Sequence, residues 1–203
     1  MKKIINISIL LILIVGLTTA CANNSKVSDK ETSYTNEQNK NDLDNTNSLV
    51  LYFSATGNTK RIANMIGDVT GSSVIELIPT DEYTAEDLNY SNDDCRANRE
   101  QNDDNARPEI KNTIDDIESY DTIYLGYPIW WGDVPKIILT FLDTYDLDGK
   151  TIVPFCTSGS SGISTSINTL RNYNSNINVL DGRRFSSSND ESDISNWINE
   201  LGQ

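Results

Sequence analysis

The chain has 203 residues, with 16 Lys and Arg against 30 Asp and Glu, a formal net charge of −14 and a pI near 4.3. This acidity excludes a basic face for phosphate backbones, so we expect no nucleic-acid partner. The chain has no histidine, which excludes Ser–His–Asp and Cys–His catalysis. Three scattered cysteines do not form the usual zinc ligand set, so we expect no metal site and no catalytic side chain of these kinds. We expect a bound cofactor to carry any chemistry.

Residues 1–20 are typical of a secretory signal peptide. Two lysines precede an almost unbroken apolar run over 4–17, which is short for a membrane span. Small residues then lead directly to Cys21, in a pattern similar to the lipobox of bacterial lipoproteins, although Thr18 stands where leucine is commonest. We expect cleavage before Cys21, a lipid on its sulfur, and a protein anchored to the cell membrane on its extracytoplasmic side. Plain secretion and an uncleaved N-terminal anchor are the alternatives.

Residues 21–47 are predicted to be the lipidated cysteine and a disordered tether. The stretch after Cys21 consists largely of Asn, Ser, Thr, Asp, Lys and Glu, which cannot bury enough apolar surface to order themselves. Cleavage would remove two lysines and leave 14 basic against 30 acidic residues, a net charge of −16. Such charge favours solubility, or it steers a basic redox partner. The folded domain is expected at 48–203.

Strands and helices alternate along this domain. Apolar runs rich in strand formers predict strands at 48–53, 74–78, 121–125, 151–156 and 177–180. Helical spacing of apolar residues predicts helices at 60–69, 110–117, 135–145, 163–170 and 194–201. This alternation predicts an α/β fold with a parallel sheet between two layers of helices, in which ligands bind beyond the carboxyl ends of the strands.

The loop after the first strand is a candidate phosphate cradle. It offers backbone N–H groups at a helix N-terminus together with several hydroxyl and amide side chains. It lacks the lysine of a nucleoside-triphosphate loop and the glycine spacing of a dinucleotide loop. An ordinary helix cap with a turn glycine is the alternative. The candidate residues are Ser54, Ala55, Thr56, Gly57, Asn58 and Thr59.

Two further loops are expected at the same edge of the sheet. The loop over 126–133 carries two adjacent tryptophans, which favours contact with a flat ring, with core packing as the alternative. The loop over 157–162 holds only small residues, which allow a close approach of backbone to ligand, although it also suits an ordinary glycine-rich turn. The candidates are Pro128, Ile129, Trp130, Trp131 and Gly132 in the first of these loops and Thr157, Ser158, Gly159 and Gly162 in the second.

These three loops resemble those of flavodoxins, and the resemblance covers essentially all of 48–203. The S-x-T-G-N-T string at 54–59 resembles the FMN-phosphate loop, and the G-Y-P-I-W-W-G string at 126–132 resembles the flavin loop of one branch. The resemblance implies a five-stranded parallel sheet in the order 2-1-3-4-5 within a three-layer sandwich. It also implies FMN held by backbone amides and hydroxyls, with a backbone carbonyl near Trp131–Gly132 facing the flavin N5.

The function implied is that of an electron carrier. We expect a monomer that passes electrons between redox protein partners at a low potential, because dense negative charge disfavours an anionic reduced flavin. An FMN-dependent NAD(P)H-type oxidoreductase acting on quinones or other small acceptors is the alternative, although no nicotinamide fingerprint is visible. A flavodoxin fold used only for binding is a third possibility, against which the intact loop at 54–59 argues.

The segment over 79–107 is an unusually long connection for this fold. A lid, a docking surface or a solvated excursion would each explain it, and the sequence favours the solvated excursion. Cys95 lies in this segment and Cys156 ends a predicted buried strand. No geometry in the sequence supports a disulfide between them, and Cys156 is expected to be a small core residue.

Overall fold

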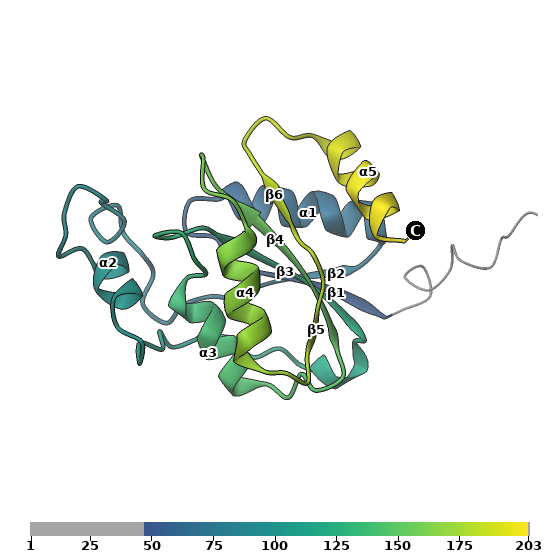
Figure 1. The fold of residues 1–203 in the computed structure, drawn as a ribbon, viewed down its shortest axis with the longest axis horizontal. Coiled ribbons are helices and arrows are strands. Elements are labelled where there is room, and N and C mark those ends of the chain that lie inside the picture. Colours follow the sequence, from purple (N-terminus) through teal and green to yellow (C-terminus); the bar gives the residue numbers. More distant parts are fainter. Residues whose placement is uncertain (1–46, 203) are drawn as a thin grey trace, which may run out of the picture. The chain divides into compact units, whose positions relative to one another are not determined.

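A computed structural model describes residues 47–202 of the chain (Figure 1). The expected signal peptide at 1–20, Cys21 and most of the expected tether lie outside the described residues. The elements, in chain order, are β1 (Ser48–Tyr52), α1 (Asn58–Thr70), β2 (Ser73–Glu76), α2 (Arg96–Gln101), the 3₁₀ helix η1 (Ile117–Ser119), β3 (Thr122–Pro128), α3 (Lys136–Thr144), β4 (Thr151–Thr157), α4 (Ser164–Tyr173), β5 (Asn178–Val179), β6 (Arg183–Phe185) and α5 (Glu191–Leu201).

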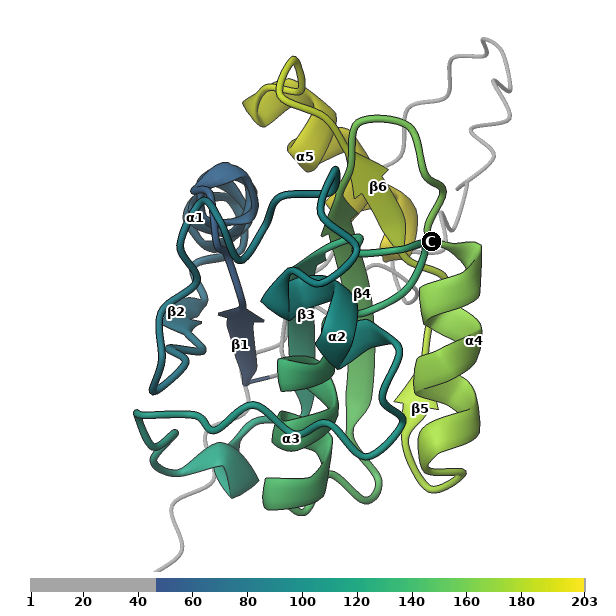
Figure 2. The ribbon, with the colours of Figure 1, turned by 90° about the vertical axis from the view of Figure 1, so that its left-hand side faces the viewer.

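The sheet is parallel and has the order β2-β1-β3-β4-β5, with β6 also paired to β4. The predicted order is therefore confirmed. Helices α1 and α5 lie on one side of the sheet, and α3 and α4 lie on the other (Figure 2). Because all pairings are parallel, the loops after β1, β3 and β4 emerge at one edge of the sheet, where ligands bind in such folds.

Both faces of the central strands are buried, as a sheet covered on two sides requires. Along β1, Leu49 and Leu51 belong to the core cluster under α3 and α4, whereas Val50 and Tyr52 belong to the cluster under α1 and α5. This alternation follows from the two-residue period of a strand. It explains why SLVLY reads as a continuous apolar run rather than an alternating one.

The helix predicted at 110–117 is wrong. Ile110 forms an antiparallel bridge with Pro79, and Lys111 N donates to the carbonyl of Ile78 at 2.7 Å. Asn112 continues the attachment, because its side chain accepts from Ile78 N and donates to the carbonyl of Glu76. Residues 110–112 are therefore attached to the chain that follows β2, residues 115–116 form a turn, and only η1 is helical. Pairing with the segment after β2 prevailed over the helical spacing of the isoleucines.

The fifth strand position is divided between two short strands. β5 pairs with the first part of β4 and β6 with its last part, whereas the sequence predicted only one strand at 177–180. Gly182 lies in the break, so close to the backbone of Pro154 that a Cβ there would stand 2.3 Å from the Pro154 carbonyl oxygen. The interruption therefore places β6 beside the end of β4 that leads into the loop at 157–162.

The long connection at 79–107 forms a compact lobe beyond the carboxyl ends of the strands (Figure 1). It contains α2, and Cys95 and Ala97 in it are buried. The expectation of a solvated excursion is therefore wrong for the base of this lobe. Within residues 47–202, no helix combines the length and apolar character needed to cross a membrane.

Candidate functional site

The three predicted loops meet at the carboxyl edge of the sheet. The hydroxyls of Thr59, at the start of α1, and Thr157, at the end of β4, share a buried hydrogen bond of 2.8 Å. The backbone N–H of Ile129 donates to the Thr157 carbonyl at 3.0 Å. These two bonds join the loop after β1 and the loop after β3 to the end of β4.

The loop at 54–59 contains a hydroxyl group that has no partner within the described part of the chain. Gly57 precedes α1 with a φ of +83°, in the left-handed region that glycine adopts without strain, and no side chain caps the helix. The Ser54 hydroxyl oxygen is buried and makes no hydrogen bond within residues 47–202. An orphaned buried hydroxyl beside an uncapped helix N-terminus fits an anionic group such as a phosphate.

A tight turn at 130–133 forms the second part of the site. Trp130 and Asp133 exchange two backbone hydrogen bonds of 3.0 and 2.9 Å, and the two residues between them have positive φ, +46° for Trp131 and +88° for Gly132. These features define a type I′ turn. Gly132 suits its position, whereas a tryptophan in the left-handed region is uncommon and persists only where its surroundings enforce it.

Side chains from two other elements hold this turn in place. Gln101, the last residue of α2, donates from Nε2 to the carbonyls of Trp130 at 3.0 Å and Val134 at 3.1 Å. On the opposite side, Thr169 of α4 donates to the Asp133 carboxylate at 2.7 Å, and the other oxygen of that carboxylate accepts from Val134 N at 2.7 Å. The strained turn is therefore enforced by α2 and α4 together.

The loop at 157–162 is organised by β6. Ser158 N donates to the carbonyl of Phe185 at 3.3 Å, and the Arg184 guanidinium donates to the Ser158 carbonyl at 3.0 Å. The Ser158 hydroxyl donates to the Ser161 carbonyl at 2.5 Å. Because β6 was not predicted, Arg184 was missed as a support for this loop.

A cavity of about 230 Å³ lies between the first two loops. None of the residues that line it is basic, so a phosphate there would be held by neutral donors. Its lining residues are Ser54, Ala55, Thr56, Thr59, Leu88, Tyr90, Pro128, Ile129 and Trp130. The structure thus brings together seven of the predicted site residues and adds two from the lobe at 79–107. The other candidates, Gly57, Asn58, Trp131, Gly132, Thr157, Ser158, Gly159 and Gly162, do not line this cavity.

The two tryptophans have different environments. Trp130 is only 4% exposed and meets Phe53 and Tyr83 edge-on, at ring-centroid distances of 5.4 and 4.9 Å. Trp131 is 41% exposed and contacts the Tyr90 ring at 4.6 Å with 31° between the planes. Core packing thus describes Trp130 well, although this side chain also lines the cavity, and Trp131 is the tryptophan available at the surface.

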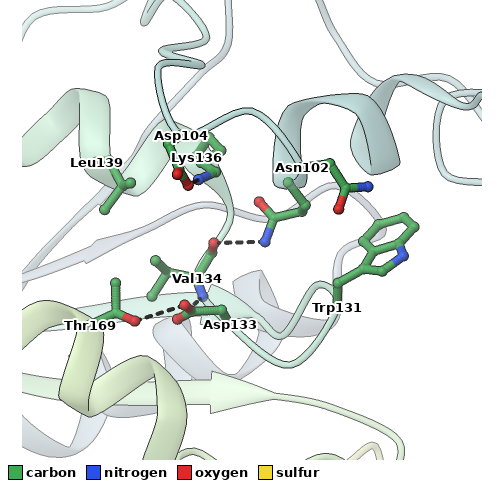
Figure 3. Close-up of a pocket in the computed structure, with 9 residues that line it drawn as sticks. Asn102, Asp104, Trp131, Asp133, Val134, Lys136, Leu139 and Thr169 are labelled. Carbon is green, nitrogen blue, oxygen red and sulfur yellow. Dashed lines mark hydrogen bonds and ion pairs between the residues drawn. The ribbon is translucent and has the colours of Figure 1, made fainter.

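A second cavity, of about 260 Å³, lies beside the same turn (Figure 3). Trp131 and Asp133 line it, whereas Trp130 lines the first cavity. The second cavity is polar, and Lys136 in it lies 3.7 Å from the Asp104 carboxylate. Its lining residues are Gln101, Asn102, Asp104, Trp131, Asp133, Val134, Lys136, Leu139 and Thr169. The two cavities are thus lined by neighbouring residues of one turn.

Cys156 is fully buried and belongs to the core below the site, as predicted. Burial raises the pKa of its thiol from 9.0 to about 12, so the group stays protonated at neutral pH. Cys95 is also buried, and both thiols are free. The structure therefore contains no disulfide within the described residues.

Fold and site together define a class of protein: a doubly wound α/β domain with a neutral anion cradle and an aromatic turn at the carboxyl edge of its sheet. A family model described as flavodoxin matches residues 47–201. The chain therefore belongs to the flavodoxin family.

Solved structures agree with this assignment. A protein classed as a flavoprotein from Bacteroides eggerthii is 40% identical over 78% of this chain and 99% of its own, with a TM-score of 0.74. Its counterpart from Bacteroides uniformis is 38% identical over 75% and 97%, with a TM-score of 0.73. A Lactobacillus acidophilus flavoprotein solved in complex with FMN is 26% identical over 75% and 99%, with a TM-score of 0.51. A comparison with the curated proteins gave no match.

Proposed function

We propose that this protein binds FMN and serves as a low-potential electron carrier. The observation that carries the proposal is the buried, unpartnered hydroxyl of Ser54 beside the uncapped start of α1, which matches the need of a phosphate for neutral donors. The FMN complex of the Lactobacillus acidophilus flavoprotein supports the identity of the ligand. FMN, when bound, supplies one- and two-electron redox chemistry.

Different residues of the site would hold different parts of FMN. Ser54, Thr56 and the backbone around Gly57 would hold the phosphate, and Thr59 would orient that loop through its bond to Thr157. The turn at 130–133 would present its Trp131–Gly132 peptide to the edge of the ring system. Because α2 and α4 fix this turn, its backbone groups are held in one conformation before any ligand arrives.

The net negative charge of the chain is the basis for the redox potential that we expect for bound FMN. A formal net charge of −14 disfavours additional negative charge on a reduced cofactor, and only charges within about 8–10 Å act strongly at physiological salt. We therefore expect the last one-electron couple to lie below that of free FMN and to rise with added salt. The same charge would favour basic surfaces on redox protein partners.

We further propose that this activity takes place outside the cytoplasm. The apolar run at 4–17 followed by small residues and Cys21 supports export and lipid attachment at the cell membrane. The polar stretch up to residue 47 would then separate the domain from the bilayer. Mass spectrometry of protein from bacterial membranes tests this: an N-terminal Cys21 peptide with attached acyl chains is expected, and an intact Met1 would refute it.

The cofactor itself is tested with purified protein mixed with FMN and freed of excess ligand. We expect flavin absorption bands that remain with the protein and quenched flavin fluorescence, followed by two separate one-electron potentials in a spectroelectrochemical titration. Protein that retains no flavin would refute FMN binding. A last couple equal to that of free FMN would refute the low-potential assignment.

A second candidate function is an FMN-dependent reductase of small acceptors. The observation in its favour is the second cavity, which adjoins the first at the turn and is large enough for a small polar molecule. Steady oxidation of NADH or NADPH by the FMN-loaded protein with a quinone, without another reductase, would establish this function in place of the carrier. Reduction that occurs only with a protein donor would establish the carrier.

A further inference from the structure

The lobe at 79–107 brings an exposed aromatic side chain to the candidate flavin site. Tyr90 is 59% exposed, although it lines the cavity beside the loop at 54–59. Its ring lies against Trp131, itself 41% exposed. Two large rings left in water beside a cavity are unfavourable unless another surface covers them.

Both ends of the lobe are anchored, and these anchors bring the segment that contains Tyr90 to the cavity. Tyr83 packs edge-on against both Phe53 and Trp130, at 5.7 and 4.9 Å between ring centroids. Gln101 at the other end of the lobe bonds to the turn carbonyls. Between these two anchors, the segment at 84–94 contains turns and carries Leu88 and Tyr90 to the cavity.

With Tyr90 in this position, the cavity between the first two loops is small. Its volume of about 230 Å³ is below the roughly 300–1,000 Å³ of most small-molecule sites. The other lining residues stand on or directly beside β1, α1 and β3, whereas Leu88 and Tyr90 lie outside any helix or strand. The wall formed by the lobe is therefore the part of the cavity lining that is least tied to the sheet and its helices.

The loop after β4 offers no ring that would do this instead, because residues 157–162 are only Thr, Ser and Gly. We propose that Tyr90, supported by Trp131, is the aromatic wall that covers the flat ring system of the bound FMN. The lobe at 79–107 is then part of the cofactor site. This inference rests on the proposed FMN binding and adds the residue that closes the site.

The test is the affinity of the full chain for FMN, measured by quenching of flavin fluorescence, together with circular dichroism of the bound flavin. Tyr90→Ala is expected to weaken FMN binding by roughly tenfold and to reduce the quenching, because stacking and apolar cover are lost. Tyr90→Phe should bind within about twofold of wild type because it keeps the ring. Tyr90→Leu, which keeps apolar cover without the ring, should recover affinity only in part and leave the quenching reduced.

Ser91→Ala is the matched control, because this neighbour is exposed on the same turn and does not line the cavity. It should match wild type in both readouts. Wild-type affinity and wild-type quenching in Tyr90→Ala would overturn the inference while leaving FMN binding intact. Failure of the wild-type protein to bind FMN would instead refute the proposed function. Because Tyr90 is exposed, all variants should keep the wild-type far-ultraviolet spectrum.

Discussion

Gln101 donates a hydrogen bond of 3.0 Å from its side-chain amide to the carbonyl oxygen of Trp130, a residue 29 positions further along the chain. The same nitrogen donates to Val134 at 3.1 Å. One side chain of the lobe at 79–107 thus bonds to both sides of the turn that contains Trp131 and Gly132. Lobe and turn therefore act as one structural unit at the mouth of the site.

Replacing Gln101 by Leu should lower stability and loosen the turn. The change removes the Gln101 donor from the carbonyl oxygens of Val134 and Trp130, although Trp130 keeps its hydrogen bond from Asp133 N, so we expect the free energy of unfolding to fall by about 1–3 kcal/mol. We expect FMN affinity to fall as well, since the strained φ of Trp131 would no longer be enforced from α2. Urea denaturation and fluorescence titration measure the two effects. Arg99→Ala, on the exposed side of α2, is the control, and equal losses in both variants would contradict this role.

Replacing Ser54 by Ala should affect the free protein and the FMN complex in opposite directions. The Ser54 hydroxyl is buried without a partner in the free domain, so its removal should leave stability unchanged or raise it. A phosphate that uses this donor would lose a hydrogen bond to a charged group, about 1.5–3 kcal/mol, and affinity should fall at least tenfold. Thermal unfolding of the free protein and flavin titration measure the two quantities. Unchanged affinity would show that the phosphate binds elsewhere.

The hydroxyl pair of Thr59 and Thr157 lends itself to a double-mutant cycle. Thr59→Val leaves the partner hydroxyl buried and unpaired, and Thr157→Val does the converse, so each should cost about 1–3 kcal/mol of unfolding free energy. The double variant should cost less than the sum of the two, because neither hydroxyl then remains unpaired. Strict additivity in urea denaturation would mean that the bond contributes nothing.

Stability should fall at alkaline pH because a thiol and a phenol group are buried in the core. Burial raises the pKa of the Cys156 thiol from 9.0 to about 12, and burial also raises the pKa of the Tyr127 phenol above its ordinary value. Between pH 9 and 12 the unfolded chain loses the Cys156 proton whereas the folded chain keeps it. Ionisation therefore favours unfolding, by up to about 1.4 kcal/mol per pH unit for each group.

Urea denaturation of wild type and Cys156→Ala at several values from pH 8 to pH 11 checks this expectation. The variant starts from a different stability, so the slopes with pH are compared rather than the absolute values. Cys156→Ala should lose stability less steeply than wild type above pH 9, because one ionising group is gone. Equal slopes would show that the thiol ionises alike in the folded and unfolded chains.

Local residue pattern alone determined much of this protein. The apolar runs of β1, β3 and β4 and the helical spacing in α1, α3, α4 and α5 predicted a parallel sheet between two helical layers, because both faces of such strands must be apolar. The loop strings at 54–59 and 126–132 identified the family and most of the cavity wall. These features depend on neighbours within a few positions, so a single sequence contains the information.

Tertiary structure decided what depends on partners distant in sequence. The isoleucines at 110–117 keep a helical spacing, yet Ile110 pairs with Pro79 and the α-helix does not form. β6 forms because it pairs with the end of β4. Tyr83 and Tyr90 of the lobe contact Trp130 and Trp131 only in the folded chain. The wall formed by Leu88 and Tyr90 joins residues some 40 positions apart. No local pattern encodes such contacts, because their free energy comes from burial and hydrogen bonds made only once the chain has folded.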